Sequence, residues 1–294
     1  MSEQLATVAA RFERAPYNAR LGLRVETIGP DRVRVRIPYK DENSNPGKAL
    51  HGGVPASTIN IAGVLAAWTG FSNGAALETG TLDLSVNYLA AAIGEDIVAT
   101  AEVLRRGKEI VYSDVDVRND AGKRIAKGLV TYRSFDRRTN SAAGERQRTA
   151  TAPAMPKAGD VPPMARALTA VPFIARLGMS IESMRDGLSL LYMPFRPENA
   201  DHGDVVHEGA LAALIDTAGA MASWSIVGLN LRYKASTVGI HVNYHAPATR
   251  EDVVAVGRTL RRNNEIFLNE VTVAAQASGR VIATGSVTYR IVVL

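Results

Sequence analysis

Two segments of this chain combine a histidine, one or two glycines and a polar residue inside an apolar run. The first begins at His51 and reaches Asn60, and the second begins at His207 and reaches Asp216. An ionisable carboxylate in an apolar helix is costly unless it is paired or used, so Asp216 is a candidate for acid–base or nucleophilic chemistry. The alternative is a buried structural carboxylate, and we favour the functional interpretation.

Gly52 follows His51 at the expected start of the first helix. A helix N-terminus offers unpaired N–H groups and the positive end of the helix dipole, and a residue without a side chain lets a ligand reach them. For the side chains of His51 and His207 two interpretations stay open. They take part in the chemistry, or they only hydrogen-bond the preceding loop while the backbone beside them acts.

The spacing within each segment separates its two polar residues. Asp216 is the ninth residue after His207, and Asn60 is the ninth residue after His51. Nine residues of α-helix span about 13.5 Å and end about half a turn out of phase. Cooperation therefore requires two such helices side by side, and a chain that carries both can supply the pair by itself.

Composition narrows the class of protein. The 294 residues suffice for two domains, and 46% hydrophobic with 21% charged residues is typical of a soluble globular protein. No apolar run reaches the roughly 18 residues of a membrane span, and the first residues show no signal-peptide pattern. Without cysteine there is no disulfide scaffold and no thiol chemistry. We therefore expect a cytoplasmic protein that does not enter a membrane.

The net charge of +5 is concentrated in one segment, because Arg137 to Arg166 alone contributes +4. A nucleic-acid surface needs basic residues clustered on a folded face, so nucleic-acid binding is disfavoured, whereas a small anionic ligand is compatible. No group of residues has metal-ligand spacing, and no phosphate-cradling glycine loop occurs. We therefore predict no metal site and no separate cofactor.

The chain repeats itself at an offset of 156 residues. The matching pairs include Ala19–Gly22 with Ala175–Gly178, His51 with His207, Trp68 with Trp224, and Val86–Tyr88 with Val242–Tyr244. Gly128–Arg133 recurs as Gly285–Arg290 at an offset of 157, which requires one extra residue in the turn before Gly279. So many matches at one offset indicate a duplication.

Each repeat predicts the same elements in the same order. In the first they are a helical lead-in (8–21), two strands (23–28 and 32–37), a polar loop (40–50), the central helix, and four strands (81–88, 96–105, 110–118 and 124–133). Their counterparts in the second are a lead-in (164–177), strands at 180–184 and 188–193, a loop (196–206), and strands from positions 237, 252, 266 and 280. This order predicts an α+β fold in which an antiparallel sheet wraps around one apolar helix. The predicted domains are residues 1–136 and 164–294. The segment 137–163, rich in Ala, Thr, Arg and Pro, is read as an exposed linker.

The element order, the His-Gly-Gly loop before the central helix, the Asp nine residues on and the Asn-Tyr that ends the next strand resemble the hotdog-fold acyl-CoA thioesterases. The phenylacetate-pathway branch is the most similar, and the resemblance covers both repeats. It implies two tandem hotdog domains that pair edge to edge within one chain. It also implies an acyl-CoA substrate, with coenzyme A as part of that substrate, and further association into a homo-oligomer.

The resemblance also implies roles for individual residues. The Gly52 amide becomes the oxyanion donor, Asp216 the base or nucleophile, and Thr237 a hydroxyl that places water. Asn45, six residues before His51, orients the histidine loop or contacts the thioester carbonyl. Family sites combine the loop of one domain with the carboxylate of the other, so these residues form one complete site.

The second crossed site is expected to be degenerate or regulatory. It combines Asn60, Thr81, Asp201, His207 and Glu208, and so lacks the carboxylate at Asn60, places a charge at Asp201 and replaces the glycine with Glu208. Four strand-end arginines are candidates for the phosphates of coenzyme A, although a solvated turn is the simpler interpretation: Arg105, Arg106, Arg261 and Arg262.

Two other functions are compatible with this sequence. One is an acyl-thioester hydratase or dehydratase on the same fold, although the short His–Asp motif of such enzymes is not visible. The other is a non-catalytic acyl-CoA-binding module, which the loss of a carboxylate at Asn60 favours. The sequence leaves open the acyl length, aromatic or aliphatic preference, and coenzyme A or acyl carrier protein as the carrier.

Overall fold

The computed structural model describes residues 3–71, 77–136, 159, 161–230 and 232–293. The first repeat contains helices α1 (Glu3–Arg14), α2 (Pro16–Leu21) and α3 (Gly53–Trp68), the short 3-10 helix η1 (Asp41–Asn43), and strands β1 (Arg24–Gly29), β2 (Arg32–Ile37), β3 (Leu77–Tyr88), β4 (Ile97–Arg106), β5 (Ile110–Arg118) and β6 (Arg124–Asp136). The second contains α4 (Pro163–Leu168), α5 (Pro172–Leu177), η2 (Pro197–Asn199) and α6 (Glu208–Val227), with β7 (Ser180–Arg185), β8 (Leu188–Met193), β9 (Lys234–Tyr244), β10 (Val253–Asn263), β11 (Ile266–Ala275) and β12 (Val281–Val292). The two repeats thus share one order of elements.

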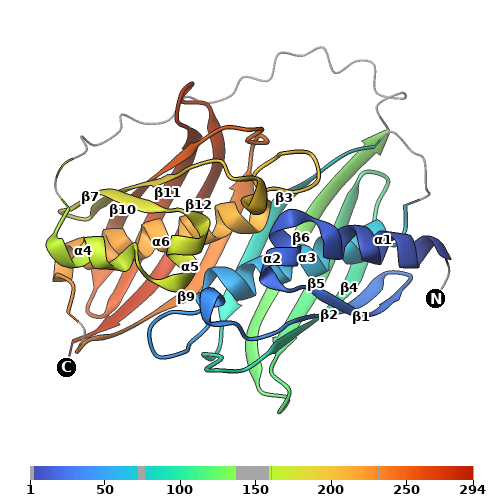
Figure 1. The fold of residues 1–294 in the computed structure, drawn as a ribbon, viewed down its shortest axis with the longest axis horizontal. Coiled ribbons are helices and arrows are strands. Elements are labelled where there is room, and N and C mark those ends of the chain that lie inside the picture. Colours follow the sequence, from blue (N-terminus) through green and yellow to red (C-terminus); the bar gives the residue numbers. More distant parts are fainter. Residues whose placement is uncertain (1–2, 72–76, 137–158, 160, 231, 294) are drawn as a thin grey trace.

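All the described strands join one antiparallel sheet of twelve strands. Its order is β1-β2-β4-β5-β6-β3-β9-β12-β11-β10-β8-β7, so each half is a six-stranded sheet and the halves join edge to edge through β3 and β9. Figure 1 shows the two halves side by side, with the helices on one face of the sheet. This confirms the predicted α+β fold of two tandem hotdog units paired within one chain.

The junction between β3 and β9 reveals the symmetry of the pair. Ser85 lies opposite His241, and these two positions are related by the repeat offset of 156. Residues on either side pair symmetrically, from Asp83 with Asn243 to Asn87 with Gly239. A local two-fold relation therefore passes between Ser85 and His241, and it generates two equivalent positions between the repeats.

Each central helix is apolar on every side because it lies inside the sheet. Burial is continuous from Gly53 to Ala67 in α3 and from Gly209 to Trp224 in α6. A helix that is apolar all round is stable only when it is surrounded by protein. The hydroxyl groups within these helices are satisfied locally, as when Thr58 donates to the carbonyl of Val54 at 2.7 Å.

The two central helices run antiparallel, with their N-terminal halves in contact. A Cβ atom at Gly53 would lie 2.5 Å from the Cβ of Ala213, and one at Gly209 would lie 2.7 Å from the Oγ of Ser57. Glycine is therefore required at both points of close approach. This approach brings the start of each helix to the middle of the other, which is where the sequence places its polar residues.

Reciprocal arginine contacts fasten the repeats. Arg20 of α2 donates to the Oδ1 atom of Asn199 at 3.0 Å, and Arg176 of α5 donates to Oδ1 of Asn43. Each asparagine also donates to the carbonyl at the end of the short helix in its own repeat. Burial disfavours the charged guanidinium of Arg176 and lowers its pKa to about 10. The hydrogen bond to Asn43 partly offsets the cost of burying this charge.

Some details of the helices differ from the sequence expectations, and one prediction falls mostly outside the described residues. The lead-in helix begins earlier, at Glu3, and breaks before Pro16, because proline cannot donate the backbone hydrogen bond that a continuous helix needs. The predicted linker lies mostly outside the described residues, and α4 begins at its last residue, Pro163. Helix α6 has the length and mean hydropathy, 1.5, of a membrane span, but 83% of that window is buried inside the protein. Such burial is typical of a core helix.

Candidate active site

The first interface brings Asp216 of α6 against Gly52 at the start of α3. A Cβ atom at Gly52 would lie 2.6 Å from the Oδ2 atom of Asp216, so only glycine fits at this position. Thr237 of β9 donates its hydroxyl to the Oδ1 atom of Asp216 at 2.6 Å. The Oδ2 atom has no hydrogen-bond partner in the part of the chain that the structure describes. One carboxylate oxygen is therefore fixed, while the other faces the glycine across the interface.

The Gly52 N–H points away from the helix that it precedes. The carbonyl of His51 accepts the N–H of Val54 at 2.8 Å, so it points into the first turn. Because the peptide bond is planar and trans, the N–H of Gly52 on the same peptide points the opposite way. No hydrogen bond from this N–H is found among the described residues. It is thus a donor at a helix N-terminus, where negative charge is favoured.

His51 serves as part of the local backbone structure. Its Nδ1 atom accepts the N–H of Gly53 at 3.0 Å, so this nitrogen carries no proton. The same atom lies 3.9 Å from the Oδ2 atom of Asp216, and without a proton it forms no ion pair there. Burial lowers the pKa of His51 to about 4, so the ring is neutral near pH 7. The geometry favours the interpretation in which the histidine orders the loop.

Asp216 is almost completely buried at the interface. The residue is 3% exposed, and burial raises the pKa of its carboxyl to about 6, against the lowering effect of the Thr237 hydrogen bond. Phe173 of α5 stacks on the His51 ring with a centroid separation of 4.8 Å. Asp216 is therefore deprotonated at pH 7 yet basic enough to accept a proton, which suits a general base.

Tyr88 is a site residue whose role the sequence did not reveal. Its hydroxyl donates to the carbonyl of Gly52 at 2.9 Å from the end of β3. Burial raises the pKa of Tyr88 well above its usual value, and the nearby charge of Asp216 adds to this rise. The Asn-Tyr pair entered the sequence comparison only as a similarity. The contact became visible when β3 was placed beside the start of α3.

The second interface has the opposite arrangement. Glu208, at the start of α6, directs its carboxylate toward Asn60 and Thr81 of the first repeat. The Asn60 amide donates to Oε2 at 3.1 Å, the Thr81 N–H donates to Oε1 at 2.8 Å, and the Thr81 hydroxyl also donates to Oε2. Burial raises the pKa of Glu208, and these hydrogen bonds oppose the rise. At the first interface Gly52 has no side chain, and the Oδ2 atom of Asp216 lies within 2.6 Å of where its Cβ would be.

His207 repeats the backbone role of its counterpart. Its Nδ1 atom accepts the N–H of Gly209 at 2.9 Å, and burial lowers its pKa to about 3. Tyr17 of α2 stacks on this ring at 4.6 Å. The side chain of Asp201 accepts the N–H of Gly203 at 2.7 Å, and its charge contributes to the raised pKa of Glu208. The second set of predicted residues thus also gathers at one interface.

The remaining predicted residues lie at the periphery. The N–H of Asn45 bonds to the carbonyl of Ala49 at 2.7 Å within the loop, and no side-chain hydrogen bond of Asn45 is found in the described ranges. Arg106 contacts Asp31 and donates to the carbonyl of Ala67 at 3.0 Å, so it caps the end of α3. The exposed Arg262 lies over the ring of Phe267. The exposed Arg105 and Arg261 end strands. Binding of coenzyme A phosphates by these arginines stays a prediction.

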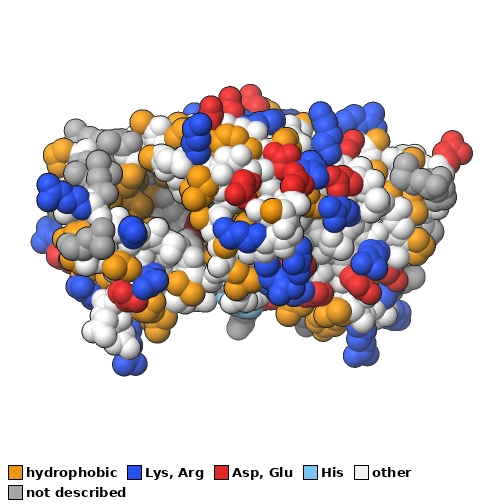
Figure 2. All heavy atoms as spheres, turned by 90° about the horizontal axis from the view of Figure 1, so that it is seen from below, with side chains coloured by type: hydrophobic (Ala, Val, Ile, Leu, Met, Phe, Trp, Pro, Cys, Tyr) orange, Lys and Arg blue, Asp and Glu red, His pale blue; other side chains and the backbone are white. Residues whose placement is uncertain are grey.

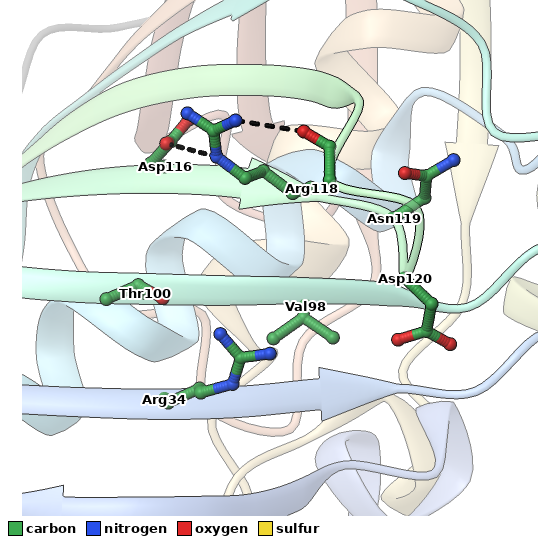
Figure 3. A pocket seen from close by; sticks show the side chains of 8 residues that line it. Arg34, Val98, Thr100, Asp116, Arg118, Asn119 and Asp120 are labelled. Carbon is green, nitrogen blue, oxygen red and sulfur yellow. Dashed lines mark hydrogen bonds and ion pairs between the residues drawn. The ribbon is translucent and has the colours of Figure 1, made fainter.

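A separate hollow of about 170 Å³ lies on the sheet face turned away from α3. Figure 3 shows Arg118 paired with Asp116 there, beside Arg34 and Asp120. Arg34 is itself paired with Glu26 at 2.6 Å. On the face drawn in Figure 2, basic and acidic side chains are interspersed. The charges around this hollow are matched, and it contains none of the interface residues.

Comparison with known proteins assigns the family. The sequence model of the thioesterase superfamily matches residues 47–126 and again residues 203–282, together more than half of the chain. Each match contains one histidine loop, one central helix and the strands that follow it. The chain therefore belongs to the thioesterase superfamily.

Individual relatives agree with a duplicated unit. Acyl-coenzyme A thioesterase 13 of Homo sapiens is 32% identical over 128 residues, which are 42% of this chain and 86% of that protein. The medium/long-chain acyl-CoA thioesterase YigI of Escherichia coli is 27% identical over 132 residues, or 40% of this chain and 84% of that protein. A solved hot dog fold protein from Alicyclobacillus acidocaldarius shares the fold over 96% of this chain and 98% of its own, with a TM-score of 0.65 and 18% identity.

Proposed function

We propose that this protein hydrolyses acyl-CoA thioesters at the interface formed by Gly52 and Asp216. One observation carries the proposal: a carboxylate from one repeat lies against the start of the other central helix, where Gly52 has no side chain and its N–H has no hydrogen-bond partner among the described residues. Relatives named as acyl-coenzyme A thioesterases support the substrate class. The family supports hydrolysis rather than hydration, and Asp216 supplies what a non-catalytic binding module would not need.

In the proposed reaction the thioester carbonyl oxygen accepts a hydrogen bond from the Gly52 N–H, at the positive end of α3. Asp216 removes a proton from water, and the resulting hydroxide attacks the carbonyl carbon. The tetrahedral intermediate places its negative charge on the oxygen that faces Gly52. It then collapses, breaks the carbon–sulfur bond, and releases the acid and the thiol, which takes the proton from Asp216.

Asp216 can also act as a nucleophile, in which case its oxygen attacks the carbonyl carbon and forms a mixed anhydride that water then hydrolyses. The Thr237 hydrogen bond fits either route, since it fixes Oδ1 and leaves Oδ2 to act. Repeated turnovers in ¹⁸O-labelled water test the anhydride route. Incorporation of ¹⁸O into Asp216 indicates an anhydride that water opens at the Asp216 carbonyl, whereas a general base never acquires the label.

We further propose one working site per chain. At the second interface the position of Asp216 is taken by Asn60, which cannot act as a base near pH 7. The position of Gly52 is taken by Glu208, whose carboxylate occupies the donors there. Both changes remove an element that the reaction needs.

A panel of acyl-CoA substrates with detection of the free thiol tests the proposal, using the wild-type protein and Asp216→Asn. We expect Asp216→Asn to lower kcat/KM by roughly 10³-fold, in the range for loss of a general base. Glu208→Gln is the matched control, since it alters the carboxylate of the other interface, and it should change kcat/KM less than about twofold.

Three results would contradict the proposal. Thiol release that is unchanged in Asp216→Asn would reject the assignment of the carboxylate. Acyl-CoA binding without thiol release in the wild-type protein would favour a binding module. Addition of water to an enoyl-CoA, with no thiol release, would favour a hydratase.

A further inference from the structure

Glu208 is a carboxylate for which the proposed reaction has no use. It lies at the start of α6, yet its hydrogen bonds all go to the first repeat, to Asn60 in α3 and to Thr81 in β3. One of the three donors, the Asn60 amide, belongs to α3. The other two, the Thr81 N–H and hydroxyl, belong to β3. A side chain held in this way ties three elements of two repeats at one point.

The donors around Glu208 form a set that suits a carboxylate. Both carboxylate oxygens of Glu208 accept hydrogen bonds. Oε1 accepts one from the Thr81 N–H, and Oε2 accepts one from the Asn60 amide and one from the Thr81 hydroxyl. The amide of Asn60 also donates to the Thr81 hydroxyl oxygen at 3.0 Å, which orients both groups. Charge-assisted hydrogen bonds of this kind are stronger than neutral ones, and an ionised carboxylate accepts at both oxygens. The negative charge of nearby Asp201 disfavours the ionised form of Glu208 and raises its pKa.

Comparison with the first interface shows that the two positions depend on each other. There the mid-helix residue is the carboxylate Asp216 and the helix-start residue is Gly52, whose Cβ would approach Oδ2 to 2.6 Å. A side chain at position 52 would therefore collide with the carboxylate of Asp216, whereas the amide of Asn60 donates a hydrogen bond to the side chain of Glu208. Glu208 with Asn60, and Gly52 with Asp216, are the two combinations in which one carboxylate occupies the interface.

We propose that Asn60 and Thr81 form a carboxylate-binding site whose resident ligand is the Glu208 side chain, and that this contact fastens the two repeats and closes the second interface to a thioester. The site is specific for a carboxylate because its donors address both oxygens. In the absence of the Glu208 side chain it takes a small free carboxylate such as formate or acetate. None of its functions depends on the reaction at Asp216.

Chemical rescue tests the ligand. Glu208→Ala removes the carboxylate and leaves the donors, and it should lower the melting temperature by roughly 5 °C. Sodium formate or acetate should restore part of this loss in a saturable manner, while sodium chloride at equal ionic strength should not. Two controls apply. In the wild-type protein the Glu208 side chain fills the site, and Glu208→Ala/Asn60→Leu lacks the amide donor, so neither should respond. Rescue of Glu208→Ala by chloride, or equal rescue of Glu208→Ala/Asn60→Leu, would overturn the assignment.

A double-mutant cycle tests the dependence of the two positions. Asn60→Asp places a second carboxylate about 3 Å from Glu208 and should destabilise through repulsion, and Glu208→Gly should destabilise through loss of the contact. The double variant recreates the combination found at the first interface. Its melting temperature should therefore lie above that of either single variant. Additive losses in the double variant would overturn the proposal.

Glu208→Gln keeps the shape of the side chain. Its melting temperature therefore tests the proposal even if Glu208→Ala or the double variant does not fold. The amide retains one acceptor oxygen and brings an NH₂ group toward the Thr81 or Asn60 donors, so a smaller loss of roughly 2 °C is expected. A melting temperature equal to that of the wild-type protein would show that the charge and both acceptors are dispensable, and would reject the site. All of these readouts measure stability or binding, so they separate this proposal from the proposed hydrolysis, which Asp216→Asn tests.

Discussion

At the first interface Gly52 faces the carboxylate of Asp216, and at the second the carboxylate of Glu208 faces the amide of Asn60. The same elements meet at both interfaces, around one local two-fold relation. The interfaces differ in the residue at the helix start and in the residue that faces it: one has a glycine beside a carboxylate, and the other has a carboxylate that accepts a hydrogen bond from an amide. After a duplication, one interface can keep the reaction while the other becomes a structural contact.

The two interfaces also differ in the residues that pack against each histidine ring. At the second interface Tyr17 stacks on His207 and shares a hydrogen bond of 2.8 Å with Ser57. The equivalent positions at the first interface are Phe173 and Ala213, which carry no polar group. An apolar environment disfavours the charged form of a carboxylate, which agrees with the raised pKa of Asp216. Burial raises the pKa of the interface carboxylate at both interfaces, Asp216 at the first and Glu208 at the second.

We expect the largest effect on activity when the helix-start residue of the second interface is introduced into the first. Gly52→Glu fills the space beside Asp216 and brings a second carboxylate to it, since even a Cβ would lie 2.6 Å from Oδ2. We expect thiol release from acyl-CoA to fall by roughly 10³-fold or more, with a loss of stability. The double variant Gly52→Glu/Asp216→Asn should regain stability and stay inactive. Activity retained in Gly52→Glu would contradict the assigned geometry.

The pH profile separates the two interfaces, because only Asp216 is proposed to react. With a pKa of about 6 the base is deprotonated above pH 7, so kcat/KM should be level there and fall about tenfold per pH unit below 6. The Thr237 hydrogen bond lowers the pKa of Asp216, so Thr237→Val should move this limb to higher pH. Thr81→Val, the equivalent change at the second interface, should leave the limb in place. If Thr237→Val leaves the acidic limb of the pH profile unchanged, the limb does not report the titration of Asp216.

Tyr88 and Tyr244 form a matched pair with equal contacts and unequal expected effects. Each hydroxyl donates at 2.9 Å to a helix-start carbonyl, that of Gly52 for Tyr88 and that of Glu208 for Tyr244. Tyr88→Phe removes one of the two hydrogen bonds that the Gly52 carbonyl accepts and loosens the residue that carries the Gly52 N–H. We therefore expect kcat to fall roughly tenfold with little change in KM. Tyr244→Phe should lower the melting temperature to a similar extent and keep kcat within about twofold. Equal kinetic effects would make both tyrosines purely structural.

The smallest expected effect concerns stability. The folded pKa of Asp216, about 6, lies above its usual value of 3.8, so the native state binds the proton more strongly than the unfolded chain. The stability that this proton provides is full below the usual pKa and is lost as the pH rises through 6. Asp216→Asn should therefore exceed the wild-type protein in free energy of unfolding by about 2–3 kcal/mol at pH 8, and the gap should close near pH 4. Urea unfolding at both values measures this, and a gap independent of pH would contradict it.

The sequence predicted much of this arrangement because its signals were local or repeated. The offset of 156 residues identified the duplication, and the strict alternation from Arg32 to Ile37 gave the bounds of β2 as observed. The spacing of nine residues also required two helices to cooperate, and the structure places Asp216 beside Gly52. The break before Pro16 and the early start of α1 were missed, since helix ends depend on packing against the rest of the repeat.

The residue types and their order alone determined that one repeat supplies a carboxylate where the other supplies an amide, and that a glycine directly follows His51 but not His207. These are covalent facts that no packing can change. The tertiary structure alone decided that the Glu208 carboxylate takes three hydrogen bonds from Asn60 and Thr81, and that Tyr88 holds Gly52. Such contacts depend on the relative position of helices and strands distant in sequence, and a side chain can reach several partners until that position is fixed. The pKa of Asp216 was decided there as well, because burial is a property of the assembled interface.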